Sequence, residues 1–302
     1  MFTKRLYESI LSKRNPVLVG LDPRLDMLPE SFGFISPDET EKIATAFSQF
    51  CREIIDVVAM LVPAVKPQVA FFEQYGPAGM SALKEIVDYA HQKQLLVILD
   101  GKRGDIGSTA SAYADGLIGP GKMSIWGGDA LTVNPYLGDD SLTPFVEVAE
   151  KRGGGIFVLV KTSNPGGAKF QDLIANGKPI YQHVAEYVQS LAVETAHANQ
   201  YGSVGAVVGA TWPRQMDELR AIMPNVWFLV PGFGAQGGSA KDVAGAFDSN
   251  GFGAIVNNSR GIIFAYRREQ YANKNWQRSV EQATLDMIAQ LRAETSVGQI
   301  AR

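Results

Sequence analysis

Short apolar runs alternate with longer segments of helical period along most of the chain. Runs such as Ile156–Val160 and Val204–Val208 lack the polar alternation of a strand with one solvated face. Strands of this kind are covered on both faces, as in a parallel sheet under helices. The pattern predicts eight buried parallel strands, at Val17–Leu21, Leu61–Val65, Leu95–Leu99, Ala130–Val133, Ile156–Val160, Val204–Val208, Val226–Val230 and Gly253–Val256.

The segments between these runs carry apolar residues at steps of three and four, which is typical of amphipathic helices. The clearest helix is predicted over Pro37–Met60. Ser36 suits its N-cap, proline suits the first helical position, and Glu39 would complete a capping box. Similar stripes predict helices around residues 80–90, 184–195 and 276–291.

Eight strand–helix units in 302 residues predict a (β/α)8 TIM barrel, with the whole chain 1–302 as one catalytic domain. The main alternative is an open doubly wound sheet. No Pro/Ser-rich linker or charge run divides the chain. Loops near 116–128 and 161–179 are long and rich in glycine, so we expect them to be functional.

Composition excludes several classes of function. The net charge is −3, from 28 Lys and Arg against 31 Asp and Glu, so no global basic field would hold nucleic acid or a membrane surface. The single cysteine, Cys51, permits no intramolecular disulfide and no thiolate metal cage. His91, His183 and His197 all lie in predicted helices without metal-ligand spacing. We therefore expect no metal site.

No run of 18 apolar residues occurs, which argues against a transmembrane helix. Residues 1–15 are helix-like and mixed in charge, without the apolar core of a signal peptide. A cytoplasmic protein is expected.

Ionisable residues gather where the predicted strands end, which is where a barrel carries its chemistry. Asp100 and Lys102 follow the third run two residues apart, so on extended backbone they share a face, and Asp105 follows at the turn into a helix. Charges after an apolar strand are costly to bury unless they pair. This spacing favours a functional array over a structural ion pair at the rim. Asp22 and Lys66, after the first two strands, would extend it.

The segment 232–237 reads G-F-G-A-Q-G and matches G-x-G-x-x-G. A dinucleotide site would place this motif after the first strand, with an acidic residue about 20 positions later. Here it follows the seventh strand, and the corresponding region reads V-N-N. The loops after strands 7 and 8 of a barrel often form a phosphate site instead, to which Arg260 could add a bidentate contact.

The segment 99–106, L-D-G-K-R-G-D-I, resembles the D-x-K-x-x-D signature of orotidine 5′-phosphate decarboxylases, in their longer bacterial form. The resemblance extends to residues 21–23, 65–67, 231–238 and 259–260, in the expected order over most of the chain. It implies a barrel enzyme without cofactor or metal. Such an enzyme converts orotidine 5′-monophosphate to UMP and CO2 in de novo pyrimidine biosynthesis, as a homodimer with shared active sites.

The resemblance also implies roles for single residues. Lys102 would protonate C6 as CO2 leaves, Asp100 would lie beside the leaving carboxylate, and Lys66 would complete the charged network. Asp105 and Thr109 would enter the site from the other subunit. The implied substrate contacts are Asp22 and Lys66 to the ribose, Ser163 or its neighbours Thr162 and Asn164 to the pyrimidine, and Gln236 and Arg260 to the phosphate in the loop that carries Gly234 and Gly237.

Two other functions remain open at this stage. One is a sugar-phosphate decarboxylase or aldolase of the same barrel superfamily, which uses a related D-x-K array with Mg²⁺. The other is a barrel that binds a nucleotide without turning it over, although a pure binding site has no use for a lysine between two aspartates.

Overall fold

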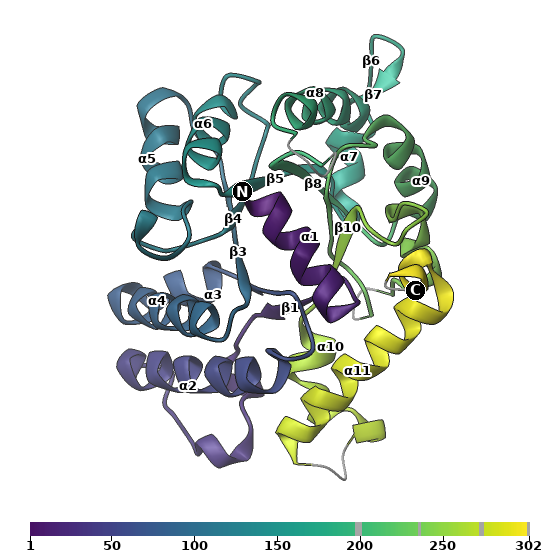
Figure 1. Cartoon of the computed structure of the whole chain (residues 1–302). Helices are drawn as coiled ribbons and strands as arrows, with labels where there is room; N and C mark the ends of the chain where they lie inside the picture. Colours follow the sequence, from purple (N-terminus) through teal and green to yellow (C-terminus); the bar gives the residue numbers. More distant parts are fainter. Residues whose placement is uncertain (197–200, 235–236, 272–274, 301–302) are drawn as a thin grey trace.

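A computed structural model describes the chain except for residues 197–200, 235–236, 272–274 and 301–302. Eight parallel strands close into a barrel in the order β1-β2-β3-β4-β5-β8-β9-β10, and β10 pairs with β1 (Figure 1). The predicted TIM barrel is confirmed, and the open sheet is wrong. The strands are β1 Val17–Leu21, β2 Ala64–Pro67, β3 Leu96–Arg103, β4 Ala130–Val133, β5 Gly155–Lys161, β8 Val204–Val208, β9 Phe228–Val230 and β10 Ala254–Asn258, with a separate antiparallel pair of β6 Ile174–Ala175 and β7 Lys178–Pro179.

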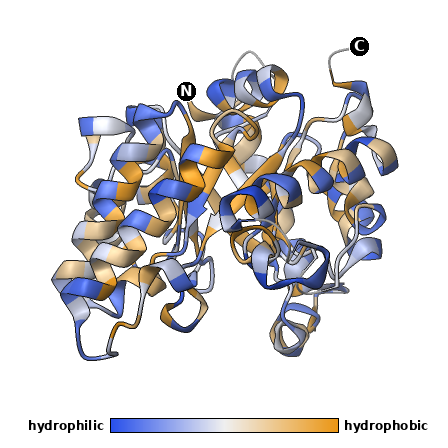
Figure 2. Cartoon of the chain, turned by 90° about the horizontal axis from the view of Figure 1, so that it is seen from below, coloured by the Kyte–Doolittle hydropathy of each residue, from blue (hydrophilic) through white to orange (hydrophobic). Residues whose placement is uncertain are grey.

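Helices surround the barrel and turn their apolar stripes toward the strands. In Figure 2 hydrophobic and hydrophilic residues alternate along the same outer helices. Among the described residues between β9 and β10 the helix is a 3-10 helix, Lys241–Ala246, and no α-helix is found, so the expectation of an α-helix after every strand is wrong there. The α-helices are α1 Phe2–Lys13, α2 Thr40–Val58, α3 Ala70–Glu73, α4 Gly76–Gln92, α5 Gly107–Leu117, α6 Thr143–Arg152, α7 Ala168–Gln171, α8 Ile180–Glu194, α9 Pro213–Ile222, α10 Arg260–Ile263 and α11 Trp276–Glu294.

Several predicted boundaries are wrong, and the local reasons are clear for two of them. The second strand begins at Ala64, because Leu61 and Val62 form the turn that ends α2, and both amides donate to the carbonyl of Val58. Helix α2 begins at Thr40 rather than Pro37, because Ser36 and Glu39 bond across a turn that precedes the helix. The Glu39 carboxylate accepts from the Ser36 amide at 3.1 Å, and the Ser36 hydroxyl donates to Asp38.

Helix α1 covers the amino-terminal end of the barrel (Figure 1). Its Arg5 forms an ion pair with the fully buried Asp129, which precedes β4, and the carboxylate of Asp129 also accepts from the Val97 amide at 2.7 Å. At the same end, Trp227 Nε1 donates to Thr3 at 2.9 Å. Helix α1 does not cover the opposite end of the barrel, where the strands end and the loops that follow them begin. Of the described helices, none combines the length and apolarity that crossing a bilayer requires.

Candidate active site

A cavity of about 770 Å³ opens at the carboxyl ends of the barrel strands. Its walls combine apolar side chains from the barrel interior, such as Leu159 and Val207, with charged and polar side chains from the strand ends. Such a mixture fits a small polar ligand that must be oriented. The sequence-predicted residues that line it are Asp22, Lys66, Asp100, Lys102, Ser163 and Arg260, together with Thr162 and Asn164.

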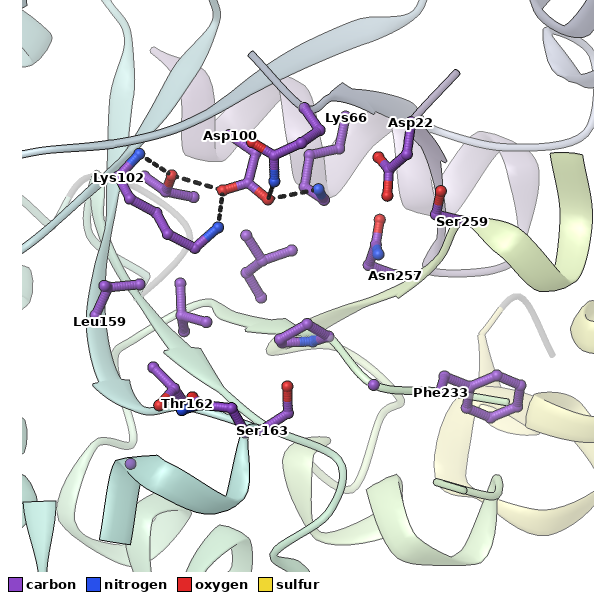
Figure 3. A pocket seen from close by; sticks show the side chains of 18 of the residues that line it. Asp22, Lys66, Asp100, Lys102, Leu159, Thr162, Ser163, Phe233, Asn257 and Ser259 are labelled. Carbon is purple, nitrogen blue, oxygen red and sulfur yellow. Dashed lines mark hydrogen bonds and ion pairs between the residues drawn. The ribbon is translucent and has the colours of Figure 1, made fainter. Parts of the chain in front are cut away.

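Three charged groups meet on one wall of this cavity (Figure 3). Lys66 Nζ lies 2.6 Å from Asp100 Oδ2, and Lys102 Nζ lies 2.6 Å from Asp100 Oδ1. Lys66 and Asp100 are buried, whereas about half of the Lys102 side chain is exposed to the cavity. Each carboxylate oxygen therefore holds one ammonium, and one of the two ammonium groups is accessible to a ligand.

The protonation states of this cluster follow from its charges. Burial alone would lower the pKa of Lys66, but the carboxylates of Asp100 and Asp22 outweigh burial and raise it above its ordinary value. Burial alone would raise the pKa of Asp100, but Lys66 and Lys102 outweigh it and hold that pKa far below its usual range. At neutral pH both buried groups carry their charges.

Asp100 also accepts two hydrogen bonds from neutral side chains. Gln68 Nε2 donates to Oδ2 at 3.1 Å, and the Thr132 hydroxyl donates to Oδ1 at 2.9 Å. Sequence reasoning missed both donors. A polar residue inside the otherwise apolar fourth run is the signal that could have singled out Thr132.

The spacing predicts that Asp100 and Lys102 share one face of a regular strand. The structure brings the two side chains together in a different way. The pairing of β3 with β4 shifts register between Leu99 and Arg103, and Lys102 has a φ of 46°, in the left-handed region. That conformation costs a residue with a side chain roughly 1–2 kcal/mol. The expected proximity is confirmed, but a bulge produces it.

A cluster of three polar side chains lies beside the charged cluster. Asp22 Oδ1, Asn257 Oδ1 and Ser259 Oγ are buried and have no hydrogen-bond partner in the described part of the chain. Figure 3 shows these side chains close together at the β1 and β10 ends of the cavity. A Cβ on Gly20 would lie 2.6 Å from Ser259 Cβ and 3.1 Å from Asn257 Oδ1, so this close approach requires glycine. Two carbonyl-type acceptors and a hydroxyl without partners are complementary to a ligand that offers several donors.

Comparisons with known proteins agree with this geometry. The model of the "Orotidine 5′-phosphate decarboxylase / HUMPS family" matches residues 16–275. The chain belongs to this family. It is 56% identical to the orotidine 5′-phosphate decarboxylase of Rhodopirellula baltica over 96% of this chain and 99% of that protein, and 41% identical to that of Caldicellulosiruptor bescii over 98% and 99%. Among solved structures, the OMP decarboxylase of Leishmania donovani matches with a TM-score of 0.75 and 32% identity, over 97% of this chain and 98% of that one.

Two residues that the resemblance assigns to a shared site lie outside the cavity of their own chain. Asp105 and Thr109 are not among its lining residues, and the carboxylate of Asp105 accepts from the amide of Ile106 at 2.8 Å. The cavity of a single chain therefore lacks the last aspartate of the D-x-K-x-x-D signature.

The glycine-rich loop after β9 is shaped by its own backbone. Gly234 and Gly237 have φ values of 70° and 92°, which glycine adopts readily. The Gly234 amide donates to the Gly238 carbonyl at 2.8 Å, and the Gly237 amide donates to the Gly234 carbonyl at 2.9 Å. Both amides are thus used within the loop, and neither glycine lines the cavity. Gln236 lies outside the described residues. Arg260, at the start of α10, lines the cavity from the adjoining strand end.

Cys51, His91 and His183 are not among the residues that line the cavity. Cys51 is buried in α2, where burial raises the pKa of its thiol. His91 and His183 lie on helices α4 and α8, and His197 lies outside the described residues. Among the residues that are described, no three His, Cys, Asp or Glu side chains gather as a metal site would require.

Proposed function

We propose that this protein decarboxylates orotidine 5′-monophosphate to UMP and CO2, the last step of de novo pyrimidine biosynthesis, without a cofactor. The observation that carries the proposal is the arrangement of Lys66, Asp100 and Lys102 in the cavity of a chain from the decarboxylase family. The high identity to named decarboxylases over nearly the whole chain favours this reaction over the sugar-phosphate chemistry of the same barrel superfamily.

The charged cluster suits the difficult step of this reaction. The bond from C6 to the carboxyl group breaks, its electron pair stays on C6, and CO2 leaves. An ammonium fixed beside C6 stabilises the developing negative charge most in the transition state. Lys102 would then give one Nζ proton to C6 and regain a proton from solvent. Asp100, kept ionised by both lysines, holds the Lys102 ammonium in place. It would lie beside the departing carboxylate.

The remaining lining residues would bind the nucleotide. The partnerless acceptors of Asp22 and Asn257, with the Ser259 hydroxyl, match the two hydroxyls of a ribose. Arg260 would contact the phosphate, together with Gln236 of the β9 loop. Ser163, in the loop that follows β5, would contact the pyrimidine. Binding energy from the phosphate, far from C6, can serve to orient the ring.

We also propose that two chains share their active sites in a homodimer. Asp105 and Thr109 lie outside their own cavity, and the surface around them exposes Ile106, Tyr113 and Tyr136. Exposed apolar surface next to a functional segment is typical of an interaction site. The loops after β3 and β4 are in contact here, since a Cβ on Gly104 would lie 3.0 Å from the Asn134 carbonyl.

Mixing two inactive variants tests the shared site. Lys102→Ala damages one component and Asp105→Ala the other, so a hybrid dimer holds one intact site and one doubly damaged site. Partial recovery of activity after mixing supports the proposal. Failure to recover despite demonstrated subunit exchange would mean that each site is built within one chain.

We further propose that residues 1–302 act as one catalytic domain and that the reaction takes place in the cytoplasm, since phosphorylated substrate and product are charged and remain in the compartment where they are made.

A spectrophotometric assay tests the reaction. We expect purified protein to turn over orotidine 5′-monophosphate at the same rate with and without EDTA. Turnover only of a keto-sugar phosphate, and only with Mg²⁺, would identify the related aldolase or decarboxylase chemistry instead. Binding of UMP without turnover would identify a nucleotide-binding barrel.

A further inference from the structure

Thr132 occupies a special place in the pairing of β3 with β4. Leu99 pairs with Leu131 and Arg103 pairs with Val133, so three residues of β3 face the single residue Thr132. This extra length is the bulge that contains Asp100 and Lys102. Thr132 is almost completely buried, and its side chain lines the active-site cavity.

The Thr132 hydroxyl links the two ends of Lys102. The backbone N–H of Lys102 donates to Thr132 Oγ1 at 2.9 Å, and that hydroxyl donates to Asp100 Oδ1 at 2.9 Å. The ammonium of Lys102 lies 2.6 Å from the same carboxylate oxygen. The three contacts form a closed ring, which runs from the Lys102 amide through Thr132 and Asp100 back to the Lys102 side chain.

This ring explains how a bulged residue keeps a defined position. The bulge removes the regular strand partner of the Lys102 amide, and the Thr132 hydroxyl takes its place as acceptor. A hydroxyl has one proton and two lone pairs, so it can accept from the amide and donate to the carboxylate together. The left-handed φ of Lys102, 46°, persists only where its surroundings fix it.

We propose that Thr132 is a positioning residue, which fixes the Lys102 ammonium for proton delivery by joining the Lys102 backbone to the Asp100 carboxylate. This inference rests on the proposed decarboxylase function. Thr132 acts on the reacting atoms only through Lys102 and Asp100.

Two substitutions separate the hydroxyl from the shape of the side chain. Thr132→Val keeps the volume and removes the hydroxyl, whereas Thr132→Ser keeps the hydroxyl and removes the methyl group. We expect Thr132→Val to lower kcat by about 100-fold, because displacement of a catalytic group by about 1 Å has effects of this size. Thr132→Ser should retain kcat within about fivefold of the unaltered protein. UMP affinity should stay within about threefold in both, since Thr132 is not assigned a contact to the bound nucleotide.

The outcomes are distinguishable from a failure of the proposed function. If the unaltered protein does not turn over orotidine 5′-monophosphate, the decarboxylase function is wrong. If it does, and Thr132→Val keeps kcat within about twofold or Thr132→Ser is impaired equally, the positioning role is wrong. Thr132→Ala provides the same comparison with Thr132→Ser if the valine variant does not fold.

A crystal structure of Thr132→Val, or of Thr132→Ala, gives a readout that does not depend on activity. We expect Lys102 to leave its left-handed backbone conformation or its Nζ to leave hydrogen-bond distance of Asp100 Oδ1. An unchanged Lys102 would overturn the proposal.

Discussion

Lys161, fully buried at the end of β5, forms an ion pair with Asp172, which directly follows α7 in the loop beyond that strand. The ammonium also lies 4.6 Å from the ring centre of Trp212 and 5.1 Å from that of Tyr181. The segment between the paired residues contains Ser163 and forms one wall of the cavity. This ion pair therefore holds the loop after β5 against the barrel. We propose that this loop contacts the pyrimidine.

Removing the two partners of this pair should have unequal effects. Asp172→Ala leaves a buried ammonium without its carboxylate, so we expect the free energy of unfolding to fall by about 3 kcal/mol. Lys161→Met leaves Asp172, which is 40% exposed, to solvent and should cost less than about 1 kcal/mol. Urea denaturation measures both, with the exposed Lys169→Met as control. Equal losses for the two variants would contradict this assignment.

The buried acceptors without hydrogen-bond partners should make the affinity for a nucleotide depend on the hydroxyl groups of its sugar. We expect UMP to bind at least about tenfold more tightly than its 2′-deoxy or 3′-deoxy analogue, because the missing hydroxyl leaves a buried acceptor without a donor. Asn257→Ala should reduce the ratio of the affinity for UMP to that for the deoxy analogues severalfold. Asn250→Ala, at an exposed position, should leave this ratio unchanged. Calorimetric titration with the three nucleotides checks this. Equal affinity for all three would exclude ribose from this part of the cavity.

Backbone strain at Lys102 predicts an unusual order of stability between two inactive variants. Lys102→Gly and Lys102→Ala both remove the amine, but only alanine must hold a side chain at a φ of 46°. We expect the glycine variant to be more stable by about 1 kcal/mol. At Lys169, in α7, the order should reverse, because alanine is the better helix former. Denaturation of the four variants tests the strain independently of activity, and a Lys102→Ala variant as stable as Lys102→Gly would refute it.

Asp129 predicts a loss of stability in acid. Burial alone would raise the pKa of Asp129, but the hydrogen bond with His91 and the charge of Arg5 outweigh burial and lower it. In the unfolded chain an aspartate titrates near pH 4. The stability that Asp129 contributes is therefore present above about pH 4 and is lost as the pH falls toward its folded pKa.

Unfolding free energies measured between pH 3 and 5 should show this dependence. Asp129→Asn should be less stable at neutral pH and should change less with pH, whereas the exposed Asp26→Asn should follow the unaltered protein. An acid dependence in Asp129→Asn as steep as in the unaltered protein would assign the effect to other carboxylates.

Sequence periodicity was sufficient for the barrel but not for its irregular parts. The ends of β1, β4 and β8 follow directly from apolar runs, because a strand buried on both faces leaves an uninterrupted apolar signal. The bulge at Lys102 leaves no such signal, because it depends on the pairing of two strands distant in sequence. Thr132 stands out as the polar residue of an apolar run, but its role, like that of Asn257, is not predictable, since a polar residue in a strand does not reveal what its side chain contacts.

The position of helix α1 limits the route by which substrate enters and products leave the enzyme. It packs across the amino-terminal end of the barrel and is held there by Arg5 and Thr3. A nucleotide that reacts beside Lys102 must then arrive and depart on the side of the strand ends, and CO2 shares that passage with UMP. A ligand lodged at the entrance would therefore obstruct uptake of substrate and release of both products alike.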